Sequence, residues 1–434
     1  MNSTFHEWSV GFLNYSAFIY LASMFCLFIG VLRDPQKSRW VFIGKYLAFA
    51  ALLSHTSGLL TRWYEGGLER PPWTNLYESL VFFAWGASVL LNLAIFKWKV
   101  TLAGVVLTPF IFLLMGMSVM TPNKVVEPLI PALQSYWNRI HVVFGMLSYG
   151  AIMSSASLAF LHLLKNKFSI KKIGGMLSLL SMMLVLMMAG REFYKTGRLY
   201  LARTVEQTLP DGSKAQVKDQ YREYEGGPIV TRFEEVPRGN VPVVVSSVLF
   251  LVAALAYFSR SFHKIGHRLF AAGIISMLAF LVWVIWATKV NEHLTLQSNP
   301  YLLMSLLTAF FFDLFYFAVL WKQGKFMDSL PSANRLDELS YKNLLFAFPA
   351  QTLLLITGAI WAYYSWGRSW GWDPKETWAF ITYIAMLIYL HGKLLMKWKA
   401  NSLSILAIVI MAIMIFAFLG VNLLLSGLHS YGAA

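Results

Sequence analysis

Long apolar runs recur along the whole chain, and each of them is about as long as one crossing of a lipid bilayer. An apolar run of about 20 residues spans the hydrocarbon core as a helix, because a helix satisfies its own backbone hydrogen bonds there. The composition agrees, since 57% of the 434 residues are hydrophobic and only 13% are charged. A soluble globular enzyme and a disordered chain are therefore excluded, and the sequence predicts an all-α polytopic membrane protein.

Twelve runs are long enough, so we predict about 12 transmembrane helices. They lie at residues 10–31, 41–60, 76–96, 102–118, 142–164, 174–190, 241–259, 268–288, 302–321, 344–364, 376–396 and 402–425. The first run has no basic segment before it and no small-residue cleavage site, so it is predicted to be a retained helix. The single cysteine, Cys26, excludes an intrachain disulfide and dithiol chemistry within this chain.

The net charge of +15 is distributed unevenly over the segments between the predicted helices. If the N-terminus lies outside, the cytoplasmic segments hold 20 basic and four acidic residues, whereas the outer segments hold 16 of each. Lys and Arg concentrate in cytoplasmic loops, so this asymmetry predicts an N-out, C-out orientation and explains the positive charge without nucleic acid. The one large outer loop is predicted at residues 191–240.

An outer segment before the predicted span 376–396 concentrates tryptophan in a way that a helical core does not. Residues 366–378 read WGRSWGWDPKETW. Glycine lets the backbone approach a large flat ligand, and each indole offers a stacking face and one N–H donor. Asp373 before Pro374 predicts a helix N-cap, with Glu376 in the first turn. The structural alternative is an interfacial tryptophan belt, which does not need these three residues in this order.

Two histidines on different predicted helices lie at the same outer face as this segment. His141 precedes the span 142–164, and His429 follows the span 402–425. Imidazole is a common axial ligand of haem iron, so the pair could ligate a flat metal macrocycle from both faces. A single histidine is more often a hydrogen-bonded helix-end residue, and only the combination with the aromatic segment favours haem. His391 lies 15 residues beyond Glu376, about 22 Å deeper at the helical rise.

Residues 366–378 resemble the tryptophan-rich WWD signature of haem-handling membrane proteins, and other blocks resemble the CcsA (ResC) family of the System II cytochrome c biogenesis pathway. The resemblance covers residues 10–165 and 335–434, and its blocks follow the order of the family. These blocks are HTSGLLTRW (55–63), NLYES (75–79), SYW (135–137) before His141, LDELSY (336–341), DPKETW (373–378) and GLHSYG (427–432).

The resemblance implies a set of haem-binding residues. His141 and His429 would be the axial ligands of an outer haem, and His391 would be a ligand of a haem within the membrane. The platform for the outer haem would comprise Trp366, Gly367, Trp370, Trp372, Asp373, Glu376 and Trp378.

The resemblance also implies the activity: haem delivery across or out of the membrane and attachment to the CxxCH motif of an apocytochrome c. The haem would be haem b, and the chain would be a component of a cytochrome c synthase, with its own status as an enzyme left open. A CcsB (ResB) type membrane protein would supply the second ligand of the inner haem. A thioredoxin-like protein would reduce the thiols, because Cys26 cannot do so alone. The expected location is the bacterial cytoplasmic membrane, with the haem site on the periplasmic, extracytoplasmic face.

The predicted number of spans exceeds the eight of the family core. We therefore predict three parts: an N-terminal core part at 1–165, an inserted four-helix segment with its outer loop at 166–334, and a C-terminal core part at 335–434. An even number of inserted spans returns the chain to the same side of the membrane, so the core keeps its topology.

Three alternative functions and several other polar residues stay open at this point. The alternatives are a haem transporter or chaperone without attachment activity, a bis-His haem b electron-transfer protein, and a WWD protein of the System I pathway. An electron-transfer protein needs no outer aromatic platform, and the blocks at 336–341 and 427–432 favour CcsA over System I. His55, His162 and the mid-span Asp313 are either functional or hydrogen-bonded structural residues.

Overall fold

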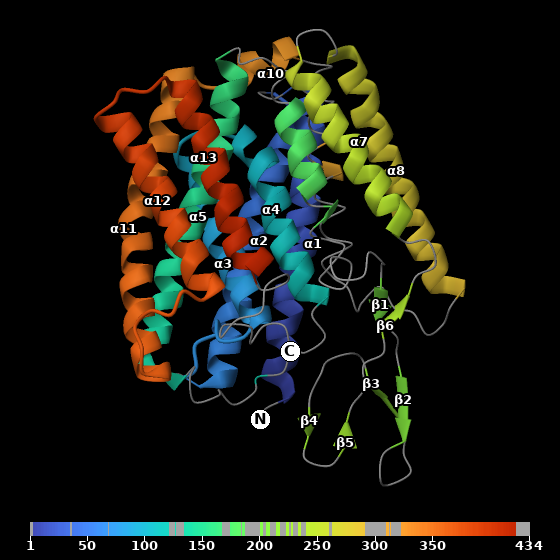
Figure 1. The fold of residues 1–434 in the computed structure, drawn as a ribbon, viewed down its shortest axis with the longest axis vertical. Helices are drawn as coiled ribbons and strands as arrows, with labels where there is room; N and C mark the ends of the chain where they lie inside the picture. Colours follow the sequence, from blue (N-terminus) through green and yellow to red (C-terminus); the bar gives the residue numbers. More distant parts are fainter. Residues whose placement is uncertain are drawn as a thin grey trace. The chain divides into compact units, whose positions relative to one another are not determined.

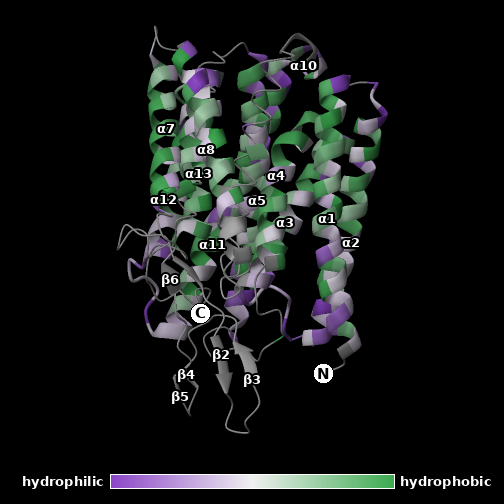
Figure 2. Ribbon diagram, turned by 90° about the vertical axis from the view of Figure 1, so that its right-hand side faces the viewer, coloured by the Kyte–Doolittle hydropathy of each residue, from purple (hydrophilic) through white to green (hydrophobic). Residues whose placement is uncertain are grey.

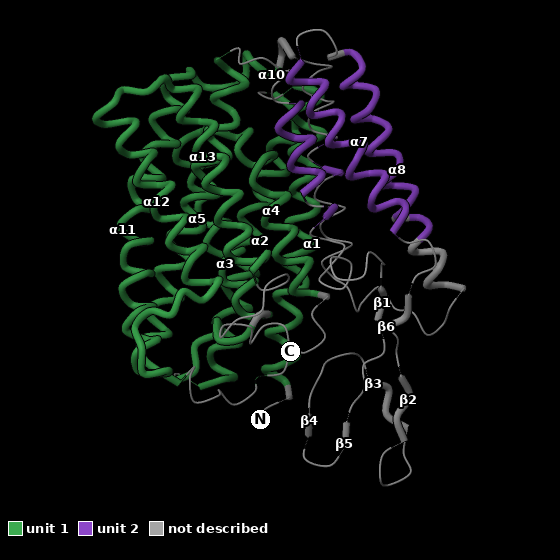
Figure 3. Tube along the Cα trace, in the orientation of Figure 1, with its two compact units in different colours: residues 1–119, 124–168, 317–432 green, residues 120–123, 169–316, 433–434 purple. Residues whose placement is uncertain are grey.

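The structure is a computed structural model. It describes residues 3–34, 37–67, 69–120, 126, 134–166, 174–183, 185–186, 200–202, 205–208, 214–217, 223–224, 227–228, 233–235, 240–259, 263–290, 310–311, 313 and 323–421. The chain forms two compact units (Figure 3). Unit 1 comprises residues 1–119, 124–168 and 317–432, and unit 2 comprises residues 120–123, 169–316 and 433–434.

Unit 1 is a bundle of long helices (Figure 1). Its described helices are α1 (Ser3–Arg33), α2 (Arg39–Gly66), α3 (Leu76–Asn92), the π-helix η1 (Leu93–Lys97), α4 (Leu102–Met120), α5 (Tyr136–Lys165), α10 (Gln323–Ser329), α11 (Ala333–Trp366), α12 (Pro374–Leu394), α13 (Ala400–Ile415) and the π-helix η4 (Phe416–Gly420). Side-chain caps begin several of them, and Asn75, for example, accepts a hydrogen bond from the N–H of Glu78 at the start of α3.

Unit 2 contains the helical pair α7 (Asn240–Phe258) and α8 (His263–Val290), the short apolar helix Gly174–Met183, and six strands of two to four residues. β1 (Tyr200–Ala202) pairs antiparallel with β6 (Phe233–Glu235), with Leu201 opposite Glu234. The other antiparallel pairs are β2 (Val205–Thr208) with β3 (Lys214–Val217), and β4 (Glu223–Tyr224) with β5 (Gly227–Pro228). These strands fall within the predicted outer loop 191–240, so this loop contains short antiparallel strand pairs in a protein whose other described elements are helices.

Seven of the described helical segments are long and apolar enough to cross a membrane: α1, α3 with η1, α4, α5, α7, α11, and α13 with η4. This confirms a polytopic membrane protein. α2, α8 and α12 coincide with three further predicted spans, and Gly174–Met183 with part of a fourth. The span 302–321 lies almost entirely outside the described residues, so the count of twelve and the orientation stay predictions.

Large apolar side chains cover the outward faces of the bundle, as expected for a surface in contact with lipid. Phe18 on α1 is 64% exposed, Phe42 on α2 is 62% exposed, and Phe346 on α11 is 53% exposed. Figure 2 shows apolar residues along most of the length of the helices. A soluble bundle rarely exposes contiguous apolar patches of this kind, so the burial pattern agrees with a lipid environment.

Small residues and short polar side chains hold the helices of unit 1 together, as is usual in membrane bundles. A Cβ on Gly58 of α2 would lie 2.7 Å from the side chain of Leu13 on α1, so these helices approach closely only because the residue is glycine. Ser148 Oγ of α5 donates to Gln351 Oε1 of α11 (2.8 Å), and Gln351 Nε2 donates to the Ala379 carbonyl of α12 (3.1 Å). Gln351 thus joins α5, α11 and α12.

Candidate functional site

A cavity lies where α5, α11 and the first turns of α12 meet, beside the tryptophan-rich segment. It is lined by His141, Tyr149, Leu354, Leu355, Gly358, Ala359, Trp361, Ser369, Trp370, Lys375, Glu376 and Ala379. Its volume is about 90 Å³, or about 550 Å³ when the open space at its mouth is counted. The fold therefore brings His141 into one cavity with two residues of the predicted platform, Trp370 and Glu376.

His141 is held against α11 in an orientation that suits an axial metal ligand. Its Nδ1 lies 2.8 Å from the Leu354 carbonyl, and its ring lies 5.8 Å from the Trp361 ring, centroid to centroid. A carbonyl oxygen only accepts, so Nδ1 carries the proton of the neutral imidazole, and Nε2 carries the lone pair that a haem iron requires. A Cβ on Gly358 would lie 2.9 Å from the imidazole, so glycine is needed for α11 to come this close.

The tryptophan-rich segment is a short connection between α11 and α12 with an unusual backbone. α11 ends at Trp366, and Gly367 follows in the left-handed region with φ +73°, its N–H donating to the Tyr363 carbonyl (2.9 Å). Trp372 also has a positive φ, +55°, which is uncommon for a bulky residue and is a form of strain found at functional sites. Its side chain is 69% exposed and meets the Trp370 ring edge-on at 5.7 Å.

The predicted cap of α12 is confirmed. The Asp373 carboxylate accepts from the Lys375 N–H (3.0 Å), as an N-cap does. The Glu376 carboxylate accepts from the N–H of Gly371 (2.8 Å) and the N–H of Asp373 (3.2 Å), which completes a capping box. Both carboxylates therefore hold the loop on the helix N-terminus and fix the position of Trp370 and Trp372.

The first and last tryptophans of the segment, Trp366 and Trp378, are packed into the bundle. Trp366 lies against Trp361 with ring centroids 5.1 Å apart, and Trp378 lies against Phe416 of η4 at 4.4 Å. Both are half-buried. Trp366 and Trp378 therefore support the loop. The other two tryptophans present aromatic surface to a ligand: Trp370 lines the cavity, and Trp372 is the most exposed of the four.

Of the other two predicted haem ligands, the structure describes only His391. His391 lies on α12 with an exposed side chain, and its Nδ1 is 2.9 Å from the Leu387 carbonyl one turn earlier. Its surroundings on α12 are apolar and exposed, with Ile388 46% and Leu394 56% accessible. His429 lies outside the described residues, so the structure brings one of the two outer histidines to the platform.

Three polar residues left open by the sequence have structural partners. His162 is buried, and its Nδ1 lies 2.8 Å from Ser404 Oγ of α13. His55 is buried, and its Nδ1 lies 3.4 Å from Tyr20 OH. Asp313 in unit 2 accepts a hydrogen bond from Ser181 Oγ (2.9 Å). Each of the three side chains therefore has at least one polar partner within the described residues, while His55 Nε2 and Asp313 Oδ2 are buried without a hydrogen bond there.

A buried ion-pair cluster joins α2 to α3 and involves two of the family-like blocks. Arg62 Nε donates to Glu78 Oε1 (2.9 Å), Arg62 Nη2 lies at ion-pair distance from that oxygen (2.9 Å), and Arg70 Nη1 lies 3.1 Å from it. The N–H and Oγ1 of Thr74 bond the other oxygen, Glu78 Oε2, at 2.9 and 2.8 Å. The Glu78 carboxylate is thus satisfied on both oxygens, which is the condition for burying a charge.

Nine of the twelve residues that line the cavity were not predicted from the sequence, and four of them contact His141 or carry a charge: Leu354, Gly358, Trp361 and Lys375. Gly358 and Trp361 lie three residues apart on α11 and therefore share a face, but nothing in the sequence says that this face meets His141. Lys375 stands inside the DPKETW block, just before the predicted span 376–396, and was not among the predicted site residues. Burial lowers the pKa of the Lys375 ammonium to about 8, and the Asp373 carboxylate opposes this shift.

Several known proteins to which this chain is similar share one name. The chain is similar to proteins named cytochrome c biogenesis protein CcsA from three cyanobacterial sources. It is 28% identical to the protein of Rippkaea orientalis over 97% of both chains, and 28% identical to that of Nostoc punctiforme over 86% of this chain and 83% of the relative. It is 26% identical to that of a Synechococcus species over 97% of this chain and 93% of the relative.

The alignment with the Rippkaea relative spans 97% of both chains, so most of residues 166–334 has a counterpart there. A family model described as Cytochrome C assembly protein matches residues 73–218 and 241–429, a range that contains His141, His391, His429 and the whole tryptophan-rich segment. Because this match covers well over half of the sequence, the chain belongs to the cytochrome c assembly protein family.

Proposed function

We propose that this chain delivers haem to the outer face of the membrane and holds it there for attachment to an apocytochrome c. The chain has a role in c-type cytochrome biogenesis, as its family and the shared name of its relatives state. The single observation that carries the finer proposal is the position of His141, with its Nδ1 bonded to Leu354, in a cavity beside the tryptophan-rich loop.

The cargo would be haem b, bound between His141 and His429 with the exposed faces of Trp370 and Trp372 beside it. Axial ligation holds the iron, and aromatic contact holds the plane of the ring. The protein would contribute positioning, because the thioether bonds form between the vinyl groups of the cargo and the thiols of the apocytochrome. The chain would thus be a component of a cytochrome c synthase.

His391 supports a second, deeper haem position that needs a partner. Its imidazole is exposed on an apolar face of α12, where a helix of another membrane protein could cover it and supply the opposite ligand. The partner that we propose is a CcsB-type protein, and a separate thioredoxin-like protein would keep the substrate thiols reduced. The site would lie on the extracytoplasmic face of a bacterial cytoplasmic membrane.

One experiment distinguishes the proposed attachment activity from the two rival functions. A haem chaperone without attachment activity would bind haem and never yield a covalent product, and an electron-transfer protein would keep its haem. Incubation of the purified chain, with and without a co-expressed partner, with reduced haem and a CxxCH peptide therefore tests the proposal. Covalent haem on the peptide is the expected result, and bound haem without transfer would contradict the proposal and support either of the two rivals.

Substitution of the two outer histidines tests the ligand assignment. His141→Ala and His429→Ala should each abolish holocytochrome formation while the protein still accumulates in the membrane. Added imidazole should restore part of the activity, because a small ligand can enter the vacated axial position. His6→Ala is the control, since His6 bonds to Glu65 away from the cavity. Normal holocytochrome in either variant would refute the assignment.

A further inference from the structure

The cavity that holds His141 is lined by one cationic and one acidic side chain besides the histidine. Among its described lining residues, Lys375 is the only Lys or Arg side chain. The one acidic lining residue, Glu376, accepts two backbone N–H groups of the loop, and Asp373 accepts the backbone N–H of Lys375 itself. Both carboxylates accept backbone N–H groups at the start of α12, and the Lys375 side chain lines the cavity beside them.

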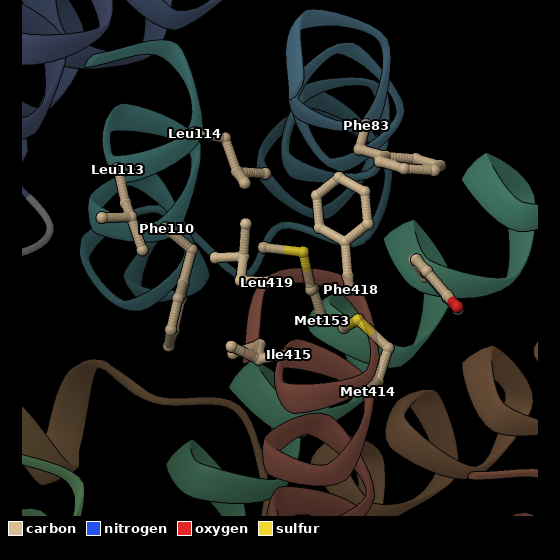
Figure 4. Close-up of a pocket in the computed structure, with 10 residues that line it drawn as sticks. Phe83, Phe110, Leu113, Leu114, Met153, Met414, Ile415, Phe418 and Leu419 are labelled. Atoms are coloured by element: carbon tan, nitrogen blue, oxygen red, sulfur yellow. The ribbon is translucent and has the colours of Figure 1, made fainter. Parts of the chain in front are cut away.

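Lys375 reaches toward the interior of the bundle. Its Nζ lies 5.8 Å from the centroid of the Phe418 ring on η4. Phe418 also lines a smaller cavity of about 30 Å³ between α3, α4, α5, α13 and η4, and Figure 4 shows its lining of Phe, Leu, Ile and Met side chains. Tyr149 lines both cavities. The Lys375 side chain thus reaches from the lining of the His141 cavity to an apolar part of the bundle.

Protoporphyrin rings have two carboxylates at one edge and vinyl groups elsewhere on the ring. A carboxylate that enters an apolar site needs a cation or several hydrogen-bond donors, because an unpaired buried charge is strongly unfavourable. We propose that Lys375 binds a propionate carboxylate of the tetrapyrrole and thereby orients the ring, carboxylate edge inward, at His141. This inference rests on the proposed function, and it adds the residue that determines which edge of the tetrapyrrole ring enters the cavity.

This orientation has a direct consequence for attachment. With the carboxylate edge at Lys375, the vinyl groups face away from the bundle, toward the loop on which Trp372 is 69% exposed. An apocytochrome approaching from the outer face would meet the reacting carbons without displacing the ring. A reversed ring would present carboxylates to the thiols, and no thioether bond could form.

The test compares haem with its dimethyl ester, in which both carboxylates are neutral while the iron and the vinyl groups are unchanged. Each is titrated into the purified full chain, and binding is followed in the Soret absorption band. Wild type should bind haem about 10-fold or more tightly than the ester, as expected for one charge-assisted contact. Lys375→Met should lose this preference, Lys375→Arg should keep most of it, and the ester should bind wild type and Lys375→Met equally.

Lys399→Met is the matched control, because Lys399 is an exposed lysine at the start of α13 whose side chain makes no capping hydrogen bond. Arg368→Met tests the nearest cationic alternative on the loop. A preference that survives in Lys375→Met, or that vanishes in Arg368→Met instead, overturns the inference. Equal affinity of wild type for haem and ester also overturns it, even if no Lys375 variant folds. Failure of the proposed function is distinguishable, since then neither compound gives a His141-dependent spectrum.

Discussion

At the scale of single residues, the site depends on how closely α11 approaches the His141 ring. Gly358→Ala tests this contact. In a helix, alanine is favoured over glycine by about 1 kcal/mol, so the helix itself should not weaken. The new Cβ would nevertheless lie 2.9 Å from the imidazole and push it out of position. We expect holocytochrome formation to fall about 10-fold or more, as for other small misplacements of a reacting group.

Gly11→Ala provides the control for this change. Gly11 also lies in a membrane helix, and its added Cβ would meet Tyr15 at 3.9 Å, an ordinary contact. Holocytochrome levels and protein abundance, measured together in both variants, separate a local effect on His141 from a general effect on insertion. Equal activity of Gly358→Ala and wild type would show that the ring is not held by this contact.

At the scale of elements, the tryptophan-rich loop is either a haem platform or a membrane anchor. If Trp370 and Trp372 contact porphyrin, phenylalanine at both positions should retain much of the bound haem, because a flat aromatic face remains. Alanine at both positions should remove haem while protein abundance stays nearly unchanged. Haem per protein in the purified variants is the measurement, and equal haem content in the double alanine variant would rule out the platform.

The capping box of α12 makes a separate prediction at this scale. Asp373→Ala removes the side chain that accepts the Lys375 N–H and should cost about 1 kcal/mol of local helix stability, with a partial loss of haem. Asp373→Ser keeps a capping oxygen and should retain haem. Ser332→Ala removes a comparable cap at the far end of α11, where Ser332 accepts the Arg335 N–H, and should leave haem per protein unchanged.

At the scale of the whole molecule, the charge asymmetry predicts which loops face the cytoplasm. A reporter fused after Lys99 or Lys172 should read cytoplasmic, and one fused after Gly212 should read extracytoplasmic, because basic loops are retained inside. The predicted loop around Gly212 has nine basic and eight acidic residues and so carries little net charge. A cytoplasmic signal from the Gly212 fusion would refute the twelve-span model in this orientation and, with it, the argument that the inserted spans preserve the core topology.

The class of this protein can be predicted from its sequence alone, because a membrane imposes simple requirements. Each crossing needs about 20 apolar residues, and these runs are visible without any tertiary information. The N-cap at Asp373 and the start of α12 were also predictable, since capping depends on residues only a few positions apart. The family-like blocks carried the expectation of haem, and the family match supports it.

Which distant residues share the site depends on how the helices pack and is not visible in the sequence. His141 and Leu354 are 213 residues apart, and their hydrogen bond exists because Gly358 lets α11 approach α5. The inward position of Lys375 depends likewise on where α12 packs against η4. Periodicity reports which face of a helix is apolar, but it does not report which helix that face meets, and a lipid-facing stripe and a helix-facing stripe look alike in sequence.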